Sequence, residues 1–172
     1  MTLGGLVRYH VLFVMELSTR NVKIAGIVFE PNGRWMEQIA RNLTDALDGF
    51  LPHKRYLIHD RSPVFTSGFA EVLRAAGVKV IKLPPRSPNV SPRAERFVRS
   101  IKSECLEKTI FFSERQLRHG VAGYLTHYHE ERNRQILGNE LILVGACFGT
   151  TGGEIHCLER LGRLLRYCHR AA

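Results

Sequence analysis

The sequence lacks the long apolar run that a membrane-spanning helix requires. Its longest such run, LILVGACF at residues 141–148, is far too short to cross a bilayer. The N-terminus also lacks the basic start, apolar stretch and small-residue cleavage site of a secretory signal. Cysteine is scarce, and Cys105, Cys147, Cys157 and Cys168 show neither close pairing nor a CxxC knuckle. We therefore expect a reduced, cytoplasmic protein with no membrane partner.

The sequence also lacks the common signatures of nucleotide-binding and hydrolytic sites. FGTTGG at residues 148–153 does not end in the GK[ST] of a phosphate-binding loop, and no GxSxG nucleophile motif occurs. The spacing of Cys and His near the C-terminus matches no zinc ribbon or finger. His127, His129 and Glu130 are expected to face solvent on a helix rather than to bind a metal. No nucleotide cofactor is therefore expected.

The sequence has an excess of basic residues, and most of this excess lies in one part of the chain. The 172 residues carry 25 Lys and Arg against 16 Asp and Glu, for a net charge of +9. Residues 61–134 hold fourteen of these basic residues against seven acids, which accounts for +7 of the total. Neutralising phosphates and releasing their counterions would drive binding of a polyanion. The charge favours a nucleic-acid partner, with a merely soluble basic surface as the alternative.

Hydrophobic periodicity predicts an α/β domain followed by a tail. The strand–helix–strand order in the middle of the chain predicts a crossover connection and a parallel pair. In chain order, the predicted elements are strands at 8–17 and 21–29 forming a hairpin, a helix within 31–50, a strand at 54–60, a helix within 62–77, a strand at 78–84, a helix that Ser91 and Pro92 begin, and a helix capped by Ser113.

The last part of the chain is predicted to be a connector and a basic amphipathic helix. Residues 135–156 contain several glycines. Wound as a helix, residues 157–172 place leucines on one side and arginines on the other. The arginines expected to bind DNA from this helix are Arg160, Arg163, Arg166 and Arg170. We therefore divide the chain into a core at 7–134 and an appendage at 135–172.

Two carboxylates stand out within the core. Asp60 closes the run YLIHDR, and Glu95 follows a proline-rich loop in SPRAERFVRSIKSECL. A carboxylate at the exposed end of a buried strand and another on an adjoining helix can share hard divalent cations through their oxygens. Either acid alone could instead be an ordinary turn or helix-terminus residue.

Basic residues surround the glutamate. Glu95, Arg99 and Lys102 are spaced at i, i+4 and i+7, which predicts one stripe along a helix. Cations on such a stripe can contact a run of backbone phosphates. The residues expected to do so around the loop and this helix are Arg86, Arg93, Arg96, Arg99 and Lys102.

Taken in order, these segments resemble the integrase core of bacterial insertion-sequence transposases and retroviral-type integrases. The segments that carry the resemblance are VLFVMELSTRNVKIAGI, YLIHDRSPVF and NVSPRAERFVRSIKSECL, and the likeness runs from about Val7 to Asn133. It implies a ribonuclease-H-like mixed sheet flanked by helices and an Asp, Asp, Glu triad, with Asp60 and Glu95 as its second and third acids. It further implies Mg²⁺ or Mn²⁺ as cofactor, DNA strand cleavage and strand transfer as activity, and a bacterial, nucleoid-associated protein.

The chain departs from this family at the first acid. The family carries that Asp on a strand preceding the one that begins here near Arg8, but residues 1–7 read MTLGGLV. Glu16 corresponds to an acidic position that is not catalytic. The resemblance therefore implies a fragment without the first strand and with little strand-transfer activity. Exposed strand edges would then favour self-association or binding to other transposase subunits. The alternatives are a DNA-binding remnant that does not cut, and a tail helix that binds protein within a transposase multimer.

Overall fold

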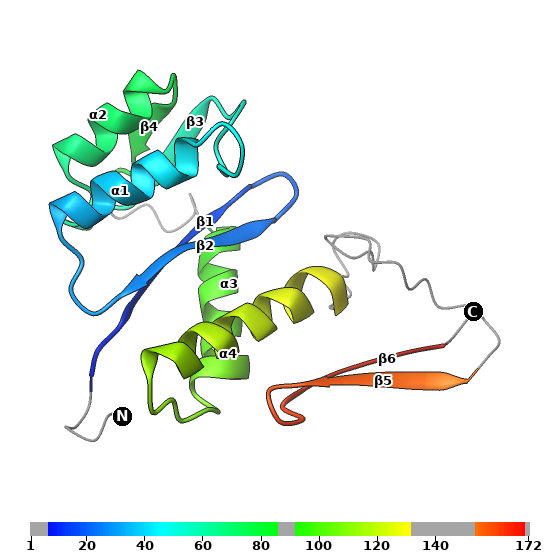
Figure 1. Cartoon of the computed structure of the whole chain (residues 1–172). Helices are drawn as coiled ribbons and strands as arrows, with labels where there is room; N and C mark the ends of the chain where they lie inside the picture. Colours follow the sequence, from blue (N-terminus) through cyan, green and yellow to red (C-terminus); the bar gives the residue numbers. More distant parts are fainter. Residues whose placement is uncertain (1–6, 86–91, 132–153, 171–172) are drawn as a thin grey trace. The chain divides into compact units, whose positions relative to one another are not determined.

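The computed structural model describes residues 7–85, 92–131 and 154–170, with side chains described as far as Cys168. The chain forms two compact units, which we name after the acid that each contains. The Asp60 unit holds Val7–Met15 and Val22–Pro92, and the Glu95 unit holds Glu16–Asn21 and the chain from Arg93 onward. Figure 1 shows the helices and strands of both. Within the described ranges, no helix is long and apolar enough to span a membrane.

The Asp60 unit begins with the predicted antiparallel hairpin. Strand β1, His10–Met15, pairs with β2, Val22–Val28, and the register slips between Leu12 and Phe13. Both strands are rich in β-branched and aromatic residues, which pack well on a pleated surface. The prediction of a hairpin is confirmed, with strands a few residues shorter than the apolar runs.

The helices of this unit begin and end at identifiable signals. Asn32 caps α1, Gly33–Thr44, by accepting a hydrogen bond from the Trp35 amide at 2.9 Å. Thr66 caps α2, Ser67–Ala75, in the same way. Just beyond α2, Gly77 has a φ of +79°, a left-handed conformation that glycine adopts without a steric cost.

A parallel strand pair and these two helices enclose one core. Strands β3, Tyr56–His59, and β4, Lys79–Lys82, are parallel, with α2 as the crossover between them. This confirms the predicted strand–helix–strand unit. The core residues that the two helices and adjoining segments bury are Met36, Ile39, Ala40, Leu43, Leu51, Phe69, Leu73 and Val78.

The expected single mixed sheet is not found among the described strands. Strands β1 and β2 form one two-stranded sheet and β3 and β4 form another. In the described ranges, no strand forms backbone hydrogen bonds with both of these sheets. The α/β character is confirmed, whereas the continuous sheet is not.

In the Glu95 unit, two helices contribute most of the buried core residues. Helix α3, Pro92–Ile101, runs into a π-helical turn at Lys102–Leu106, and α4, Glu114–Thr126, runs into another at His127–Glu131. Ser113 caps α4 by accepting from the Gln116 amide at 3.2 Å, as predicted. The apolar residues that these helices and their π-helical turns bury are Phe97, Ile101, Cys105, Leu117, Val121, Tyr124 and Tyr128.

The predicted C-terminal basic helix is wrong. Strands β5, Ile155–Arg160, and β6, Leu165–Arg170, form an antiparallel hairpin instead (Figure 1). The reason lies in the turn, where Leu161, Gly162 and Arg163 have φ values of 52°, 64° and 75°. Three successive left-handed residues are incompatible with a right-handed helix. The separation of leucines from arginines on a helical wheel was therefore not informative here.

The expectation of fully reduced cysteines is also wrong. Cys157 lies opposite Cys168 in the β5–β6 register, and the two form a disulfide. Strand pairing brings their Cα atoms to 4.0 Å, so residues eleven positions apart in sequence become direct neighbours. Cys105 is a buried free thiol, and Cys147 lies outside the described residues.

Candidate functional site

Asp60 lies at the carboxyl end of β3 and faces solvent. Its Oδ1 accepts a hydrogen bond from the Ser62 amide at 2.9 Å, an Asx turn of the kind that often follows a strand. The Arg61 Nε donates to the Leu83 carbonyl at 3.0 Å, which ties this turn to the end of β4. Within the described part of its unit, the other carboxylate oxygen of Asp60 has no hydrogen-bond partner. That oxygen is available to a cation.

Glu95 lies in the first turn of α3 and is also exposed. Two residues further on, Phe97 is 1% exposed, and its ring lies 5.0 Å from that of Tyr128 and 6.3 Å from that of Tyr124, centroid to centroid. This packing fixes the orientation of α3 within the unit. The carboxylate of Glu95 forms no hydrogen bond or ion pair with the described residues of its unit, so its oxygens remain available.

The basic stripe beside Glu95 is exposed, as its spacing predicts. Arg96, Arg99 and Lys102 all face solvent, and none forms an ion pair with the described residues of the unit. Arg93 differs, because its Nη1 donates to the Leu17 carbonyl at 2.5 Å and so holds the start of α3 to the turn after β1. Arg86 and the predicted cap Ser91 lie outside the described residues.

Leu17 belongs to a short turn that Glu16 closes. The Glu16 carboxylate accepts from the Thr19 hydroxyl at 2.8 Å, and its backbone bonds to Arg20 and Asn21 at 2.8 Å each. Glu16 thus has a local structural role in the turn, consistent with leaving it out of the acid set.

The two candidate acids belong to different units, so their joint role as metal ligands stays a prediction. Across residues 7–85, 92–131 and 154–170, no group of three or more His, Cys, Asp or Glu side chains is placed to hold a metal ion.

The C-terminal arginines do not share one face. On strands, Arg160 projects from one side of the hairpin and Arg166 from the other, according to the register. Arg163, in the turn, forms an ion pair with Glu159 at 2.8 Å. Arg166 donates through Nη2 to the Cys157 sulfur at 3.6 Å, and the side chain of Arg170 lies outside the described part of the chain. Their predicted role in DNA binding stays a prediction, without the helical arrangement on which it was based.

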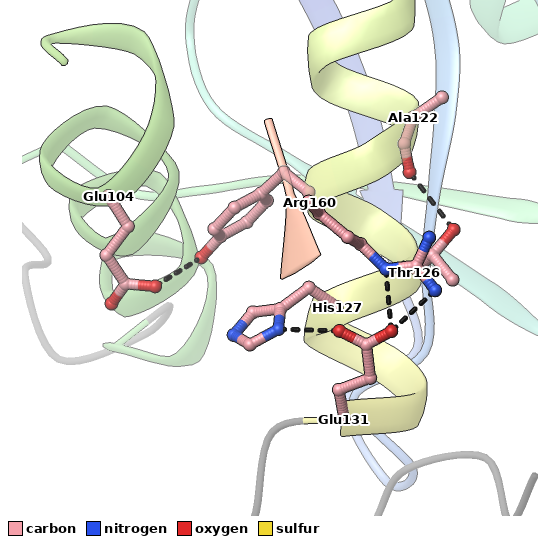
Figure 2. A network of polar contacts seen from close by, with 7 residues as sticks. Glu104, Ala122, Thr126, His127, Glu131 and Arg160 are labelled. Atoms are coloured by element: carbon pink, nitrogen blue, oxygen red, sulfur yellow. Dashed lines mark hydrogen bonds and ion pairs between the residues drawn. The ribbon is translucent and has the colours of Figure 1, made fainter. Parts of the chain in front are cut away.

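Arg160 takes part in a partly buried polar network (Figure 2). Its Nε lies 2.6 Å from the carboxylate of Glu131, and the Nδ1 of His127 lies 2.9 Å from the same carboxylate. Glu131 is only 6% exposed. Burial raises the pKa of this carboxyl, but the hydrogen bonds and charges of Arg160 and His127 outweigh that effect and leave it below its usual value. The network joins β5 to the end of α4.

The expectation that His127 and His129 face solvent is wrong. His129 is 8% exposed and the His127 side chain 12%, whereas Glu130 is exposed as expected. The π-helical turn rotates this segment relative to a regular α-helix. The i, i+4 spacing of His127 and Glu131 is a sequence signal for their pairing, but nothing local indicates that Arg160, 29 residues away, completes the network.

Comparison with known proteins agrees with the resemblance seen in the sequence. The model of the integrase core domain family matches residues 76–140, which include β4, α3 and α4. Residues 76–140 resemble an integrase core. A solved structure of the simian T-cell lymphotropic virus intasome in complex with PP2A regulatory subunit B56 gamma contains a similar chain, with a TM-score of 0.59 and 10% sequence identity. No curated protein matches the sequence.

The structural likeness covers 99% of this chain and 63% of the intasome chain. This protein therefore spans less than two thirds of that neighbour's length. At 10% identity the likeness concerns the fold alone. Together with the integrase core segment, it indicates a ribonuclease-H-like α/β fold.

Proposed function

We propose that this chain is a DNA integration and recombination protein of the integrase and transposase type that binds DNA through the exposed face of α3. One observation carries the proposal. The segment that matches the integrase core contains α3, whose buried face is anchored by Phe97. Its exposed residues include Glu95, Arg96 and Arg99, and exposed Lys102 follows at the start of the π-helical turn. Exposed arginine and lysine side chains without ion-pair partners are suited to bind phosphate.

The dimensions of the stripe fit this role. Arg96 and Lys102 are six residues apart, which corresponds to about 9 Å along a helix axis. One DNA strand presents a phosphate about every 3.4 Å of duplex axis. Arg96, Arg99 and Lys102 therefore span about two to three phosphates. Arg163 is a weaker candidate for binding phosphate because it forms an ion pair with Glu159. Arg160 is a weaker candidate as well, because it is bound to Glu131.

Asp60 and Glu95 are proposed as the carboxylates that hold Mg²⁺ or Mn²⁺. Both side chains are exposed, both have oxygens without partners among the described residues of their own units, and hard divalent cations prefer such oxygens. Bound divalent ions would supply activation of a water or a DNA 3′-hydroxyl and stabilisation of the leaving oxygen in a phosphoryl displacement. The chain's own contribution is orientation, because the Ser62 amide fixes one oxygen of Asp60 and the packing of Phe97 fixes α3 beneath Glu95.

The same cations support a second candidate function, which is DNA binding without strand cleavage. Under this alternative, α3 contacts phosphates in the same way, and the two carboxylates contribute no chemistry. Self-association, or assembly with other subunits of an integration complex, is proposed for either function.

The decisive experiment separates binding from cleavage. Labelled duplex DNA is incubated with the full chain and Mg²⁺ or Mn²⁺, and products are resolved on a denaturing gel while binding is followed by fluorescence anisotropy. Asp60→Asn and Glu95→Gln should abolish any cleavage or strand transfer and leave binding intact. Glu107→Gln, which removes an exposed carboxylate of the Glu95 unit, serves as the matched control and should change neither.

Each other outcome is informative. Binding without cleavage by the unmodified chain supports the second function. Cleavage that survives both substitutions excludes the two acids as the metal ligands. Failure of the unmodified chain to bind DNA at low salt contradicts both functions.

A further inference from the structure

We propose that Cys157 and Cys168 form a thiol–disulfide exchange site that controls whether the C-terminal hairpin, residues 155–170, stays docked on the end of α4. The two cysteines face each other across β5 and β6 and are joined by a disulfide. This site is separate from the two acids and from the α3 stripe, so it stands independently of the proposed DNA function.

The two sulfurs differ in a way that sets the direction of exchange. Cys168 is exposed, whereas Cys157 is half-buried. Arg166, which lies on the same side of the hairpin, donates from Nη2 to the Cys157 sulfur at 3.6 Å. A neighbouring guanidinium stabilises a thiolate, and a thiol with a lower pKa is a better leaving group. Attack should therefore occur at Cys168, with Cys157 departing.

The exchange needs a dithiol as co-reactant. The thiolate of the dithiol attacks Sγ of Cys168 and forms a mixed disulfide. The bond between the cysteine sulfurs breaks, and its electron pair leaves on Sγ of Cys157 beside Arg166. The second thiol of the reductant then displaces Cys168. Two electrons pass to the protein, the dithiol becomes a disulfide, and both cysteine sulfurs take up protons.

Reduction should loosen the hairpin because the disulfide is the covalent link between its two strands. An isolated two-stranded hairpin is marginal in water, and the disulfide joins the third of its six residue pairs, counted from the open end. The docking contacts among the described residues include the bonds from Arg160 to Glu131, the burial of Leu165, which is 6% exposed, and the packing of Leu161 beside Gly123. Unpairing β5 from β6 would remove the support for these contacts and release Arg160 from the buried carboxylate.

The first test measures the rate of reduction. The oxidised full chain is treated with dithiothreitol, quenched with iodoacetamide and analysed by peptide mass spectrometry. Arg166→Gln should slow reduction about threefold, since loss of a neighbouring cation raises the pKa of the leaving thiol by about one unit and a thiol of higher pKa leaves more slowly. Arg163→Gln, in the same hairpin but paired with Glu159, is the matched control.

The direction of the effect is diagnostic. A hairpin that was merely destabilised by Arg166→Gln would expose the disulfide and be reduced faster, not slower. Equal rates for Arg166→Gln, Arg163→Gln and the unmodified chain would overturn the assignment of Arg166. Failure of the two cysteines to form a disulfide in the protein oxidised with glutathione disulfide would overturn the site itself.

The second test measures docking. Hydrogen exchange of peptides covering residues 155–170 is compared between the oxidised chain, the reduced chain and the Cys157→Ser/Cys168→Ser variant. Amides of the hairpin should exchange at least about tenfold faster in the reduced chain and in the variant, while peptides from α1 stay unchanged. Identical protection in all three proteins would show that the disulfide does not control docking.

Discussion

Removing the guanidinium of Arg160 should destabilise the Glu95 unit measurably, because it leaves a carboxylate buried with one partner fewer. The substitution is Arg160→Met, which keeps the unbranched stem and deletes the charge. Glu131 would then rely on His127 alone, and its side chain is only 4% exposed. We expect destabilisation although Arg160 lies on a two-stranded hairpin at the C-terminal end of the described chain.

The magnitude lies between two limits. Breaking a fully buried ion pair costs about 3–5 kcal/mol, whereas an exposed pair contributes at most about 1 kcal/mol. The side chain of Glu131 is 4% exposed but that of Arg160 is 33% exposed, so water can partly replace the guanidinium. We therefore expect a loss of about 2 kcal/mol in the free energy of unfolding.

A double-mutant cycle isolates the interaction itself. It combines Arg160→Met with Glu131→Gln and compares the sum of the single effects with the double variant. Unfolding by urea should be followed through the amide exchange of α4, because Trp35, the only tryptophan, lies in the other unit and its fluorescence does not report on this one. A coupling energy of about 1–2 kcal/mol is expected near pH 7.

The coupling should also depend on pH. The pKa of Glu131 is lowered in the folded protein because its bonds to Arg160 and His127 outweigh the opposing effect of burial. Its stabilising contribution is therefore complete above the unfolded value of about 4.3 and is lost as pH falls through the lower folded pKa. A coupling below about 0.3 kcal/mol at neutral pH, or one that grows on acidification, would show that the ion pair between Arg160 and Glu131 does not stabilise the unit.

Two further predictions concern the core of the same unit. Phe97→Ala should lower the free energy of unfolding by about 3–5 kcal/mol in urea titrations, because it leaves a cavity at a site that is 1% exposed. The control Phe112→Ala, at a position 61% exposed, should change the free energy of unfolding by less than about 0.5 kcal/mol. Similar values for the two variants would contradict the packing of α3. Burial raises the pKa of the Cys105 thiol from 9.0 to about 11 and restricts access to it, so alkylation of Cys105 by N-ethylmaleimide near pH 8 should be at least about tenfold slower than that of reduced Cys168, which is exposed. Mass spectrometry that found both thiols labelled at one rate would contradict the burial of Cys105.

Local patterns predicted the parts of the fold that depend on neighbouring residues. The β1–β2 hairpin, the crossover from β3 through α2 to β4, and the cap of α4 at Ser113 are all confirmed. Each rests on alternation, on helical spacing or on a side-chain oxygen next to a helix start, and these signals act over a few residues.

The parts that were missed depend on contacts between distant segments. Residues 157–172 separate well on a helical wheel, but the left-handed turn around Gly162 and the pairing of Cys157 with Cys168 make them a hairpin. Glu131 pairs with His127 and also with Arg160, which lies 29 positions further along the chain. Spacing alone does not reveal a contact between residues so far apart in the sequence.

For the candidate site, the sequence predicted where the two acids lie on their elements but not how they assemble. Asp60 follows β3 and Glu95 lies in the first turn of α3, as expected, and both side chains face solvent. The joint use of the two acids depends on how the two units are arranged, a property that neither local pattern contains.

The salt dependence of DNA binding shows whether the cations of α3 and the following turn contact phosphates. Affinity for a labelled duplex is measured against salt concentration for the full chain and for two triple variants. The first is Arg96→Gln/Arg99→Gln/Lys102→Gln. The second, the control, is Arg34→Gln/Arg74→Gln/Arg115→Gln, which removes three exposed cations from other helices. If α3 contacts phosphates, the first triple variant should reduce the slope of log affinity against log salt by about 2 to 3, at about 0.9 per lost contact, and the second should leave the slope nearly unchanged. Equal slopes for the two triple variants would contradict DNA binding through α3.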